Sequence, residues 1–154
     1  MELILWRHAE AEDGGPDLAR KLTAKGEKQA RRVAEWLNTR LPQSAKVFVS
    51  PAIRAQQTAQ ALADISHHKL RTVEQIAPNA NAADVLTAAD WPQARSVIVI
   101  VGHQPTLGYV ASELLSGQAQ DWSLKKGSLW WLSQREHEGE QQTVLRAVIN
   151  PDLV

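Results

Sequence analysis

The stretch Leu3-Ile4-Leu5-Trp6-Arg7-His8-Ala9-Glu10 begins with four apolar residues and turns polar at Arg7-His8. A short apolar run bounded by polar residues is typical of a central strand that is buried on both faces. In open α/β sheets, ligands bind just beyond the carboxyl ends of the strands. We therefore expect a first strand from Met1 to Arg7, with Arg7 and His8 lying where a ligand would bind.

The composition limits the classes of protein to which the chain can belong. Its 154 residues suit a single domain, 1–154, with one sizeable core, and 17 basic residues balance 17 acidic residues. This balance gives no sign of a nucleic-acid partner. The absence of cysteine excludes disulfides, thiolate metal sites and a thiol nucleophile. Without a signal-peptide pattern or a membrane-spanning apolar run, we expect a cytoplasmic monomer with no membrane partner.

Two further apolar stretches lead from a strand directly into a helix. Lys46 to Ser50 is followed by Pro51-Ala52-Ile53-Arg54, and this second segment opens a helix that continues to about Ile65. Ser96 to Val101 holds five consecutive β-branched residues, which indicates a strand buried on both faces. It ends in Gly102-His103-Gln104-Pro105-Thr106, and a helix is expected from Leu107 to Leu115.

The rest of the chain completes an α/β pattern. Further helices are expected over Ala24–Arg40, with Thr23 as N-cap, and over Asn81–Asp90, and further strands over Leu70–Ile76, Ser128–Ser133 and Thr143–Ile149. A polar turn at Glu136–Glu140 would join the last two strands into a hairpin at one edge. These elements predict a three-layer α/β/α sandwich around a mostly parallel sheet with an antiparallel C-terminal edge.

Charged residues outside the strand ends fit ordinary solvated surface. The basic residues of the helix after Thr23, among them Lys25, Lys28, Arg31 and Arg32, are expected on its exposed faces. His67-His68 and His137 lie in polar stretches, and adjacent histidines point apart on a strand or helix. We therefore predict no metal site and no cofactor.

Four side chains follow apolar strands and are expected at the same edge of one sheet: Arg7, His8, Arg54 and His103. Arginine binds phosphate through two parallel N–H groups, and an imidazole can attack an electrophile or carry a proton. A helix N-terminus after His103 adds backbone N–H groups that favour an anion. The four residues together predict a pocket for a dianion such as a phosphoryl group.

Four motifs follow one another in the chain: Arg7-His8, Leu22-Thr23-Ala24-Lys25-Gly26, Ser50-Pro51-Ala52-Ile53-Arg54 with Thr58, and Gly102-His103. In their order and placement they resemble the histidine phosphatase superfamily, which has a phosphoglycerate mutase-like fold. The chain departs from that pattern at Ala9, where the family usually has glycine. The resemblance spans roughly residues 2 to 110, and the short length is similar to that of the SixA-type phosphohistidine phosphatases.

The resemblance implies a role for each residue of the predicted pocket. His8 would be the nucleophile that forms a phosphohistidine intermediate, and Arg7 and Arg54 would hold the phosphoryl oxygens. His103 would complete the pocket and stabilise the transition state, with Gln104 as a further phosphate-binding residue. The attacking nitrogen of His8 must be unprotonated, so an acceptor is expected at its other ring nitrogen.

The general acid of the ester-hydrolysing members has no clear counterpart in the chain. Gln75 falls where a carboxylate is expected, and strand alternation would send Glu74 to the other face. Glu10, Glu12 or Asp13 in the polar loop Ala9–Leu22 would be the substitutes.

The preferred hypothesis for the substrate is phosphohistidine in proteins, since its side chain leaves readily as a neutral imidazole. Three alternatives are a phosphatase of small phosphate esters or sugar phosphates, a mutase, which would need a closed pocket, and an inactive phosphate-binding module. A receiver-type signalling domain is excluded because no strand ends in an aspartate.

Overall fold

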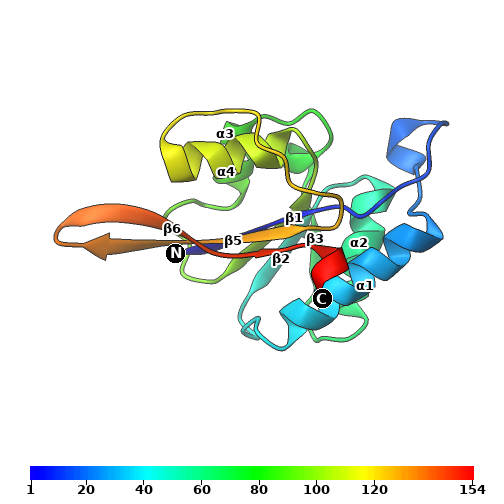
Figure 1. Cartoon of the computed structure of the whole chain (residues 1–154), viewed down its shortest axis with the longest axis horizontal. Coiled ribbons are helices and arrows are strands. Elements are labelled where there is room, and N and C mark those ends of the chain that lie inside the picture. The colour runs from blue at the N-terminus through cyan, green and yellow to red at the C-terminus, as the bar shows by residue number, and fades with distance from the viewer.

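The computed structural model describes residues 1–154 as a six-stranded sheet with helices on both faces (Figure 1). The strands are β1 (Glu2–Arg7), β2 (Lys46–Val49), β3 (Leu70–Thr72), β4 (Ile98–Gly102), β5 (Leu129–His137) and β6 (Glu140–Ile149), in the spatial order β3-β2-β4-β1-β5-β6. The pairs among β1 to β4 are parallel, and β5 and β6 are antiparallel to their neighbours. The predicted α/β sandwich with an antiparallel C-terminal edge is confirmed.

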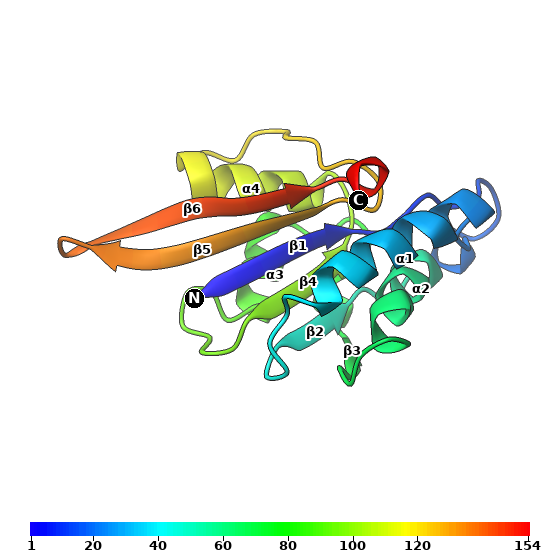
Figure 2. The ribbon, with the colours of Figure 1, turned by 60° about the horizontal axis from the view of Figure 1, so that its bottom comes forward.

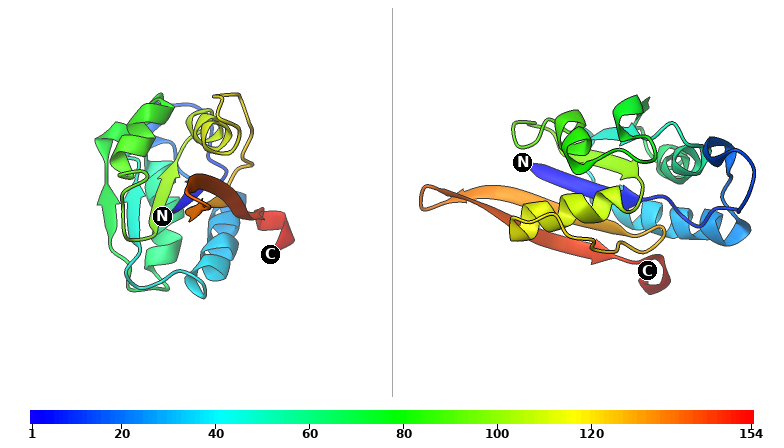
Figure 3. Two further views of the ribbon diagram at one scale, coloured as in Figure 1. Left: turned by 90° about the vertical axis from the view of Figure 1, so that its left-hand side faces the viewer. Right: turned by 90° about the horizontal axis from the view of Figure 1, so that it is seen from above.

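Two pairs of helices enclose the sheet (Figures 1 and 2). Helices α1 (Ala24–Asn38) and α2 (Ile53–Ala63) cover one face, and α3 (Ala82–Ala88) and α4 (Thr106–Ser116) cover the other. The end-on view shows the three layers side by side (Figure 3). None of the helices combines the length and apolar character that a bilayer crossing requires.

Strand β1 explains why the molecule has a core on each side of the sheet. Ile4 and Trp6 pack into the cluster beneath α1 and α2, whereas Leu3 and Leu5 pack into the cluster beneath α4. All of these side chains are fully buried, as expected where successive residues of a strand point to opposite faces. Because both faces of β1 are buried, its carboxyl end is held between α2 and α4.

Local signals in the sequence set the helix ends. The hydroxyl of Thr23 accepts a hydrogen bond from the N–H of Gly26 at 3.0 Å, which confirms the predicted N-cap of α1. Helix α3 begins with a reciprocal pair of hydrogen bonds between Asn81 and Asp84. Gly26 allows a close approach, because a Cβ there would come within 2.0 Å of the carbonyl oxygen of Glu10.

The hairpin of β5 and β6 is longer than predicted. The expected strands ended at Ser133 and began again at Thr143, but the ladder continues to His137 and Glu140 around a two-residue turn. Both turn residues, Glu138 and Gly139, have positive φ, which suits a tight hairpin turn. The tip extends beyond the other strands (Figures 1 and 2), where no buried face imposes an alternating pattern.

The third strand is shorter than predicted, and this removes one argument about the general acid. Strand β3 ends at Thr72, and Glu74 to Ile76 form a single turn of 3-10 helix, η2, in which Ile76 is buried. The predicted third strand is therefore present, but its expected end at Ile76 is wrong. Glu74 and Gln75 are both exposed on η2, so strand alternation does not separate them.

Candidate active site

Three chain segments bring two arginines and two histidines together at the carboxyl edge of the sheet. Arg7 and His8 end β1, Arg54 lies in the first turn of α2, and His103 follows β4. Because β1 and β4 are paired with Arg7 opposite Gly102, the two histidines become neighbours. Their ring centroids are 5.1 Å apart, and Arg54 reaches both rings through separate nitrogens.

The hydrogen bonds of His8 determine which of its ring nitrogens carries the proton. Nδ1 lies 2.8 Å from the carbonyl oxygen of Ala9, and a carbonyl only accepts, so Nδ1 is protonated. Nε2 lies 3.3 Å from Nε of Arg54, and a guanidinium only donates, so Nε2 presents its lone pair. The neutral imidazole is thus held with an unprotonated nitrogen facing a cation.

His103 is oriented by the same kind of contact. Its Nδ1 lies 3.4 Å from Nη2 of Arg54 and must accept, so in the neutral ring Nε2 carries the proton. That Nε2 lies 2.7 Å from the hydroxyl oxygen of Ser50, which is fully buried and follows β2. Both unprotonated imidazole nitrogens therefore face the guanidinium of Arg54.

Thr58 links the nucleophile candidate to the arginine. Its hydroxyl accepts a hydrogen bond from the backbone N–H of Ala9 at 3.0 Å and donates to the carbonyl oxygen of Arg54 at 2.7 Å. Thr58 and Ala9 are fully buried. One turn of α2 is thereby fixed against the segment that follows His8.

Arg7 retains an unused donor. Its Nη1 donates to the carbonyl oxygen of Leu124 at 2.8 Å, which positions the guanidinium, while its buried Nε has no hydrogen-bond partner. Burial lowers the pKa of Arg7 below its ordinary value, yet an arginine stays protonated in proteins. A buried charged donor without a partner is costly, and an entering anion would satisfy it.

Asp17, which the sequence analysis did not single out, brings a carboxylate to Arg54. It opens a short 3-10 helix, η1 (Asp17–Ala19), and its Oδ2 lies 3.2 Å from Nη2 of Arg54. The hydrogen bond from Arg20, followed by that from Arg54, holds the pKa of this carboxyl below its ordinary value. Asp17 thus occupies a donor that a phosphoryl oxygen would also use, and it is ionised rather than a proton donor.

Both imidazoles of the cluster are kept neutral by their surroundings. Burial, and then the charges of Arg54 and Arg7, lower the pKa of His8 to about 4, against the bond to Ala9. Burial, His8 and Arg54 lower the pKa of His103 to about 3. A bound dianion would favour the protonated forms and raise both values.

These pKa values predict a titration that can be measured directly. In the free enzyme the ring protons of His8 and His103 are expected to titrate near pH 4 and 3, and inorganic phosphate should move both midpoints upward. Proton NMR with His8→Ala and His103→Ala for assignment measures this. Since both folded-state pKa values lie below the unfolded value of about 6.5, the stability they contribute is full above pH 6.5. This stability is lost as the pH falls from 6.5 toward 4 and 3. Titration midpoints near 6.5 would contradict the buried, neutral state of the two imidazoles.

The other predicted residues lie outside this cluster of hydrogen bonds. The side-chain amide of Gln104 donates to the carbonyl oxygen of Trp122 at 2.9 Å, and its own oxygen is buried without a partner. The carboxylate of Glu10 accepts from Thr23, while Glu12 and Asp13 are exposed. None of these groups is hydrogen-bonded to His8, Arg54 or His103.

Comparison with known proteins shows the family to which the chain is similar. The model of the histidine phosphatase superfamily (branch 1) matches residues 3–78. The phosphohistidine phosphatase SixA of Escherichia coli is 29% identical over 125 residues, covering 77% of this chain and 76% of the relative. A SixA homolog of Haemophilus influenzae is 32% identical over 126 residues, covering 74% and 77%.

Solved structures agree on the fold. The protein histidine phosphatase SixA complexed with tungstate superposes with a TM-score of 0.79, at 22% identity and 99% coverage of both chains. A phosphoserine phosphatase of Entamoeba histolytica superposes with a TM-score of 0.70, at 18% identity and 96% and 95% coverage. Enzymes named for different substrates thus share this fold, which by itself does not select one.

The family model, the fold and a relative that is more than 30% identical over most of the chain all indicate the same class of protein. The chain belongs to the histidine phosphatase superfamily. Within that superfamily it is of the SixA type, and it is a phosphatase.

Proposed function

We propose that this phosphatase removes phosphoryl groups from phosphohistidine in proteins through a covalent intermediate on His8, without a metal ion. The observation that carries the proposal is the unprotonated Nε2 of His8, fixed by the contact of Nδ1 with Ala9 and faced by Arg54. Around it, Arg7, Arg54 and His103 supply the positive and hydrogen-bonding groups that a transferring phosphoryl group requires.

In the first step, the lone pair of His8 Nε2 forms a bond to phosphorus. The phosphorus–nitrogen bond of the substrate breaks, and its electron pair stays on the leaving imidazole. When the free ring nitrogen of the substrate carries a proton, the leaving group departs as neutral imidazole. This step needs no general acid in the pocket, in agreement with a site whose one contacting carboxylate, Asp17, is ionised.

In the second step, water attacks phosphorus and the bond to Nε2 breaks. Because the proton on Nδ1 of His8 is held by the carbonyl oxygen of Ala9, the phosphorylated ring retains it. The electron pair of the breaking bond then returns to Nε2 and regenerates the neutral imidazole. The products are dihydrogen phosphate and the starting enzyme. Arg7 and Arg54 would neutralise the equatorial oxygens in both steps.

Two observations support phosphohistidine as the substrate. The relatives from Escherichia coli and Haemophilus influenzae are named as phosphohistidine phosphatases. Gln75 falls where the ester-hydrolysing members have their acid, and its amide cannot protonate an alkoxide. Neither Gln75 nor the adjacent Glu74 on η2 is hydrogen-bonded to His8, Arg54 or His103. Without an acid at this cluster, an alkyl ester would leave poorly.

Two peptides of the same sequence, one with phosphohistidine and one with phosphoserine, test the substrate. We expect kcat/KM to be at least about 10²-fold higher for the phosphohistidine peptide, the smallest contribution that a general acid usually makes. Release of inorganic phosphate measures both reactions. Equal values, or a preference for phosphoserine, would favour the alternative of an ester phosphatase, and no release from any donor would favour an inactive binding module.

A further inference from the structure

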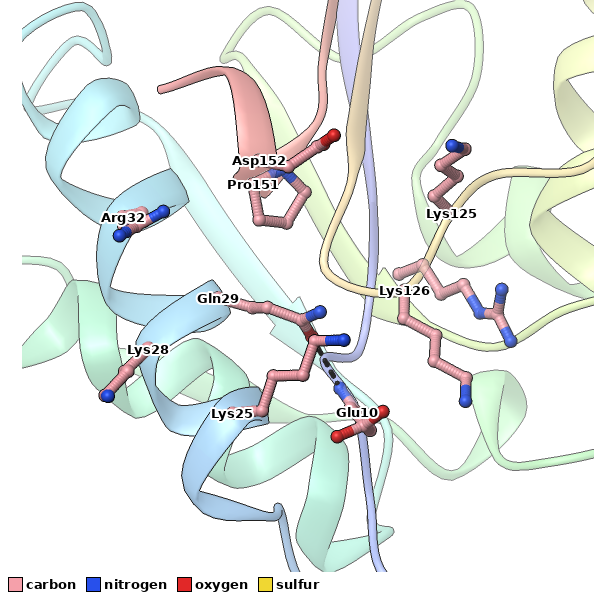
Figure 4. A pocket seen from close by; sticks show the side chains of 10 residues that line it. Glu10, Lys25, Lys28, Gln29, Arg32, Lys125, Lys126, Pro151 and Asp152 are labelled. Atoms are coloured by element: carbon pink, nitrogen blue, oxygen red, sulfur yellow. Dashed lines mark hydrogen bonds between the residues drawn. The ribbon is translucent and has the colours of Figure 1, made fainter.

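A second feature, separate from the His8 cluster, is a groove of about 650 Å³ between α1 and the segment that precedes β5 (Figure 4). We call it the basic groove and define it by six cations: Lys25, Lys28 and Arg32 of α1, Lys125 and Lys126 before β5, and Arg7 at the end of β1. Pro151 and Asp152 of η3 (Pro151–Leu153) close one side, and none of the lining residues is hydrophobic.

The charges of the basic groove are not neutralised within the chain. Six cations face two carboxylates, Glu10 and Asp152, and the ion pairs of the molecule lie elsewhere, at Arg20, Arg54 and Arg146. Glu10 is already hydrogen-bonded through its carboxylate to Thr23. Because the whole chain has a net charge of zero, this face holds an excess of positive charge that other faces must balance.

The arrangement on α1 works against the stability of that helix. Lys25 and Lys28 are three residues apart and Lys28 and Arg32 four, so like charges are neighbours on one face. Lys25 also lies in the first turn, where the helix dipole disfavours a cation. Each contact destabilises the helix by a few tenths of a kcal/mol. An anionic partner from outside the chain would reverse the sign of these interactions.

Two features connect the basic groove to the proposed nucleophile, which does not itself line the groove. Arg7 belongs both to the groove and to the His8 cluster. The N–H of Gly127 donates to the carbonyl oxygen of His8 at 3.1 Å, which places Lys126 one residue from a backbone contact with the nucleophile. Figure 4 shows Lys25 extending from α1 over Glu10, with the Lys126 side chain on the other side of Glu10. A chain bound in the groove would therefore present an adjacent side chain to His8.

We propose that the basic groove docks an acidic segment that flanks the phosphohistidine of the substrate protein, an inference that rests on the proposed function. The charge extends from the first turn of α1 to Arg32, the ninth residue of the helix, which is more than one phosphoryl group can contact. Aromatic side chains, on which bases of single-stranded nucleic acid would stack, are absent from its lining. The proposal adds selectivity for the sequence around the phosphorylated residue.

Phosphohistidine peptides flanked by four glutamates or by four glutamines test the proposal. In the wild-type enzyme at low ionic strength, kcat/KM should be about tenfold higher for the glutamate peptide, given a modest gain for each exposed charge pair. The preference should largely disappear in 1 M salt, where charges are screened within about 3 Å. It should also disappear in the variant Lys25→Gln/Lys28→Gln/Lys125→Gln/Lys126→Gln, while p-nitrophenyl phosphate is hydrolysed as by the wild type.

A variant with the same change of charge provides the control. Arg31→Gln/Lys69→Gln/Arg71→Gln/Arg95→Gln alters four exposed cations that do not line the groove, and it should keep the preference. Equal loss in both variants, or no preference in a wild-type enzyme that hydrolyses both peptides, would overturn the groove alone. A wild-type enzyme that hydrolyses neither peptide would overturn the proposed substrate as well. Competition by duplex DNA at lower concentration than the acidic peptide would assign the groove to nucleic acid instead.

Discussion

Replacing His8 with alanine is expected to lower kcat for a phosphohistidine peptide and for p-nitrophenyl phosphate by at least about 10⁴-fold. Removal of a nucleophile that forms a covalent intermediate leaves only the binding and electrostatic contributions of the pocket. The second imidazole, His103, is less accessible than His8: it is 4% exposed, and its Nε2 lies 2.7 Å from the hydroxyl oxygen of the buried Ser50, whereas His8 is only half-buried. Release of inorganic phosphate under single-turnover conditions measures the effect.

The control for this variant is His137→Ala. His137 ends β5 at the exposed tip of the hairpin, so its removal should leave kcat unchanged. The two variants should also have similar far-ultraviolet circular dichroism spectra, since neither side chain belongs to the hydrophobic core. A His8→Ala enzyme that keeps a tenth of the wild-type kcat would rule out the proposed nucleophile.

The second large effect is expected at Arg54, where alanine should lower kcat/KM by about 10³-fold. Arg54 is 4% exposed and contacts His8, His103 and Asp17 through three different nitrogens. Its removal takes away both the fixed charge and the donors that hold two imidazoles in place. Lysine should recover less than tenfold, because a point charge cannot reproduce the planar fork.

Arg31→Ala is the matched control, since Arg31 is exposed on α1 and lines neither the cluster nor the basic groove. Thermal unfolding separates loss of activity from loss of fold, and Arg54→Lys retains the cation should the alanine variant unfold. Near-wild-type activity in folded Arg54→Ala would contradict the role of this arginine. Arg7→Ala is expected to behave in the same way, though its Nη1 also holds Leu124.

The position of the cluster of Arg7, His8, Arg54 and His103 could be predicted from the buried strands that precede these residues. Five β-branched residues before Gly102 and the apolar run before Arg7 indicate parallel strands buried on both faces, and their carboxyl ends meet at one edge. The pattern predicts the edge at which both strand ends lie but not which strands are neighbours, and it is the pairing of β1 with β4 that makes the two histidines adjacent.

Groups whose position depends on loop conformation could not be predicted. Asp17 reaches Arg54 because Asp17 to Ala19 form one turn of 3-10 helix, and no periodic pattern marks such a turn. The acceptor for His8 is a backbone carbonyl, that of Ala9, which every residue possesses. The turn at Glu74–Ile76 replaced the last part of the strand expected over Leu70–Ile76, and a single 3-10 turn leaves no periodic pattern in the sequence.

The basic groove could not be predicted from the sequence for a different reason. Lys25, Lys28 and Arg32 fit an exposed helix face, and they are exposed. Their significance depends on Lys125 and Lys126, which lie about a hundred residues further along the chain and line the same groove from the segment opposite α1. A charge pattern within one helix cannot reveal a partner segment that only the tertiary fold supplies.

The most direct test of the account is to locate the phosphoryl group on the enzyme during turnover. After rapid acid-free quenching with a phosphohistidine peptide, mass spectrometry and phosphorus NMR should find one phosphoryl group, on Nε2 of His8. Nδ1 should be free of phosphate, because the carbonyl oxygen of Ala9 holds its proton. A phosphoryl group on any other residue, or turnover that proceeds without a phosphorylated enzyme, would contradict the account.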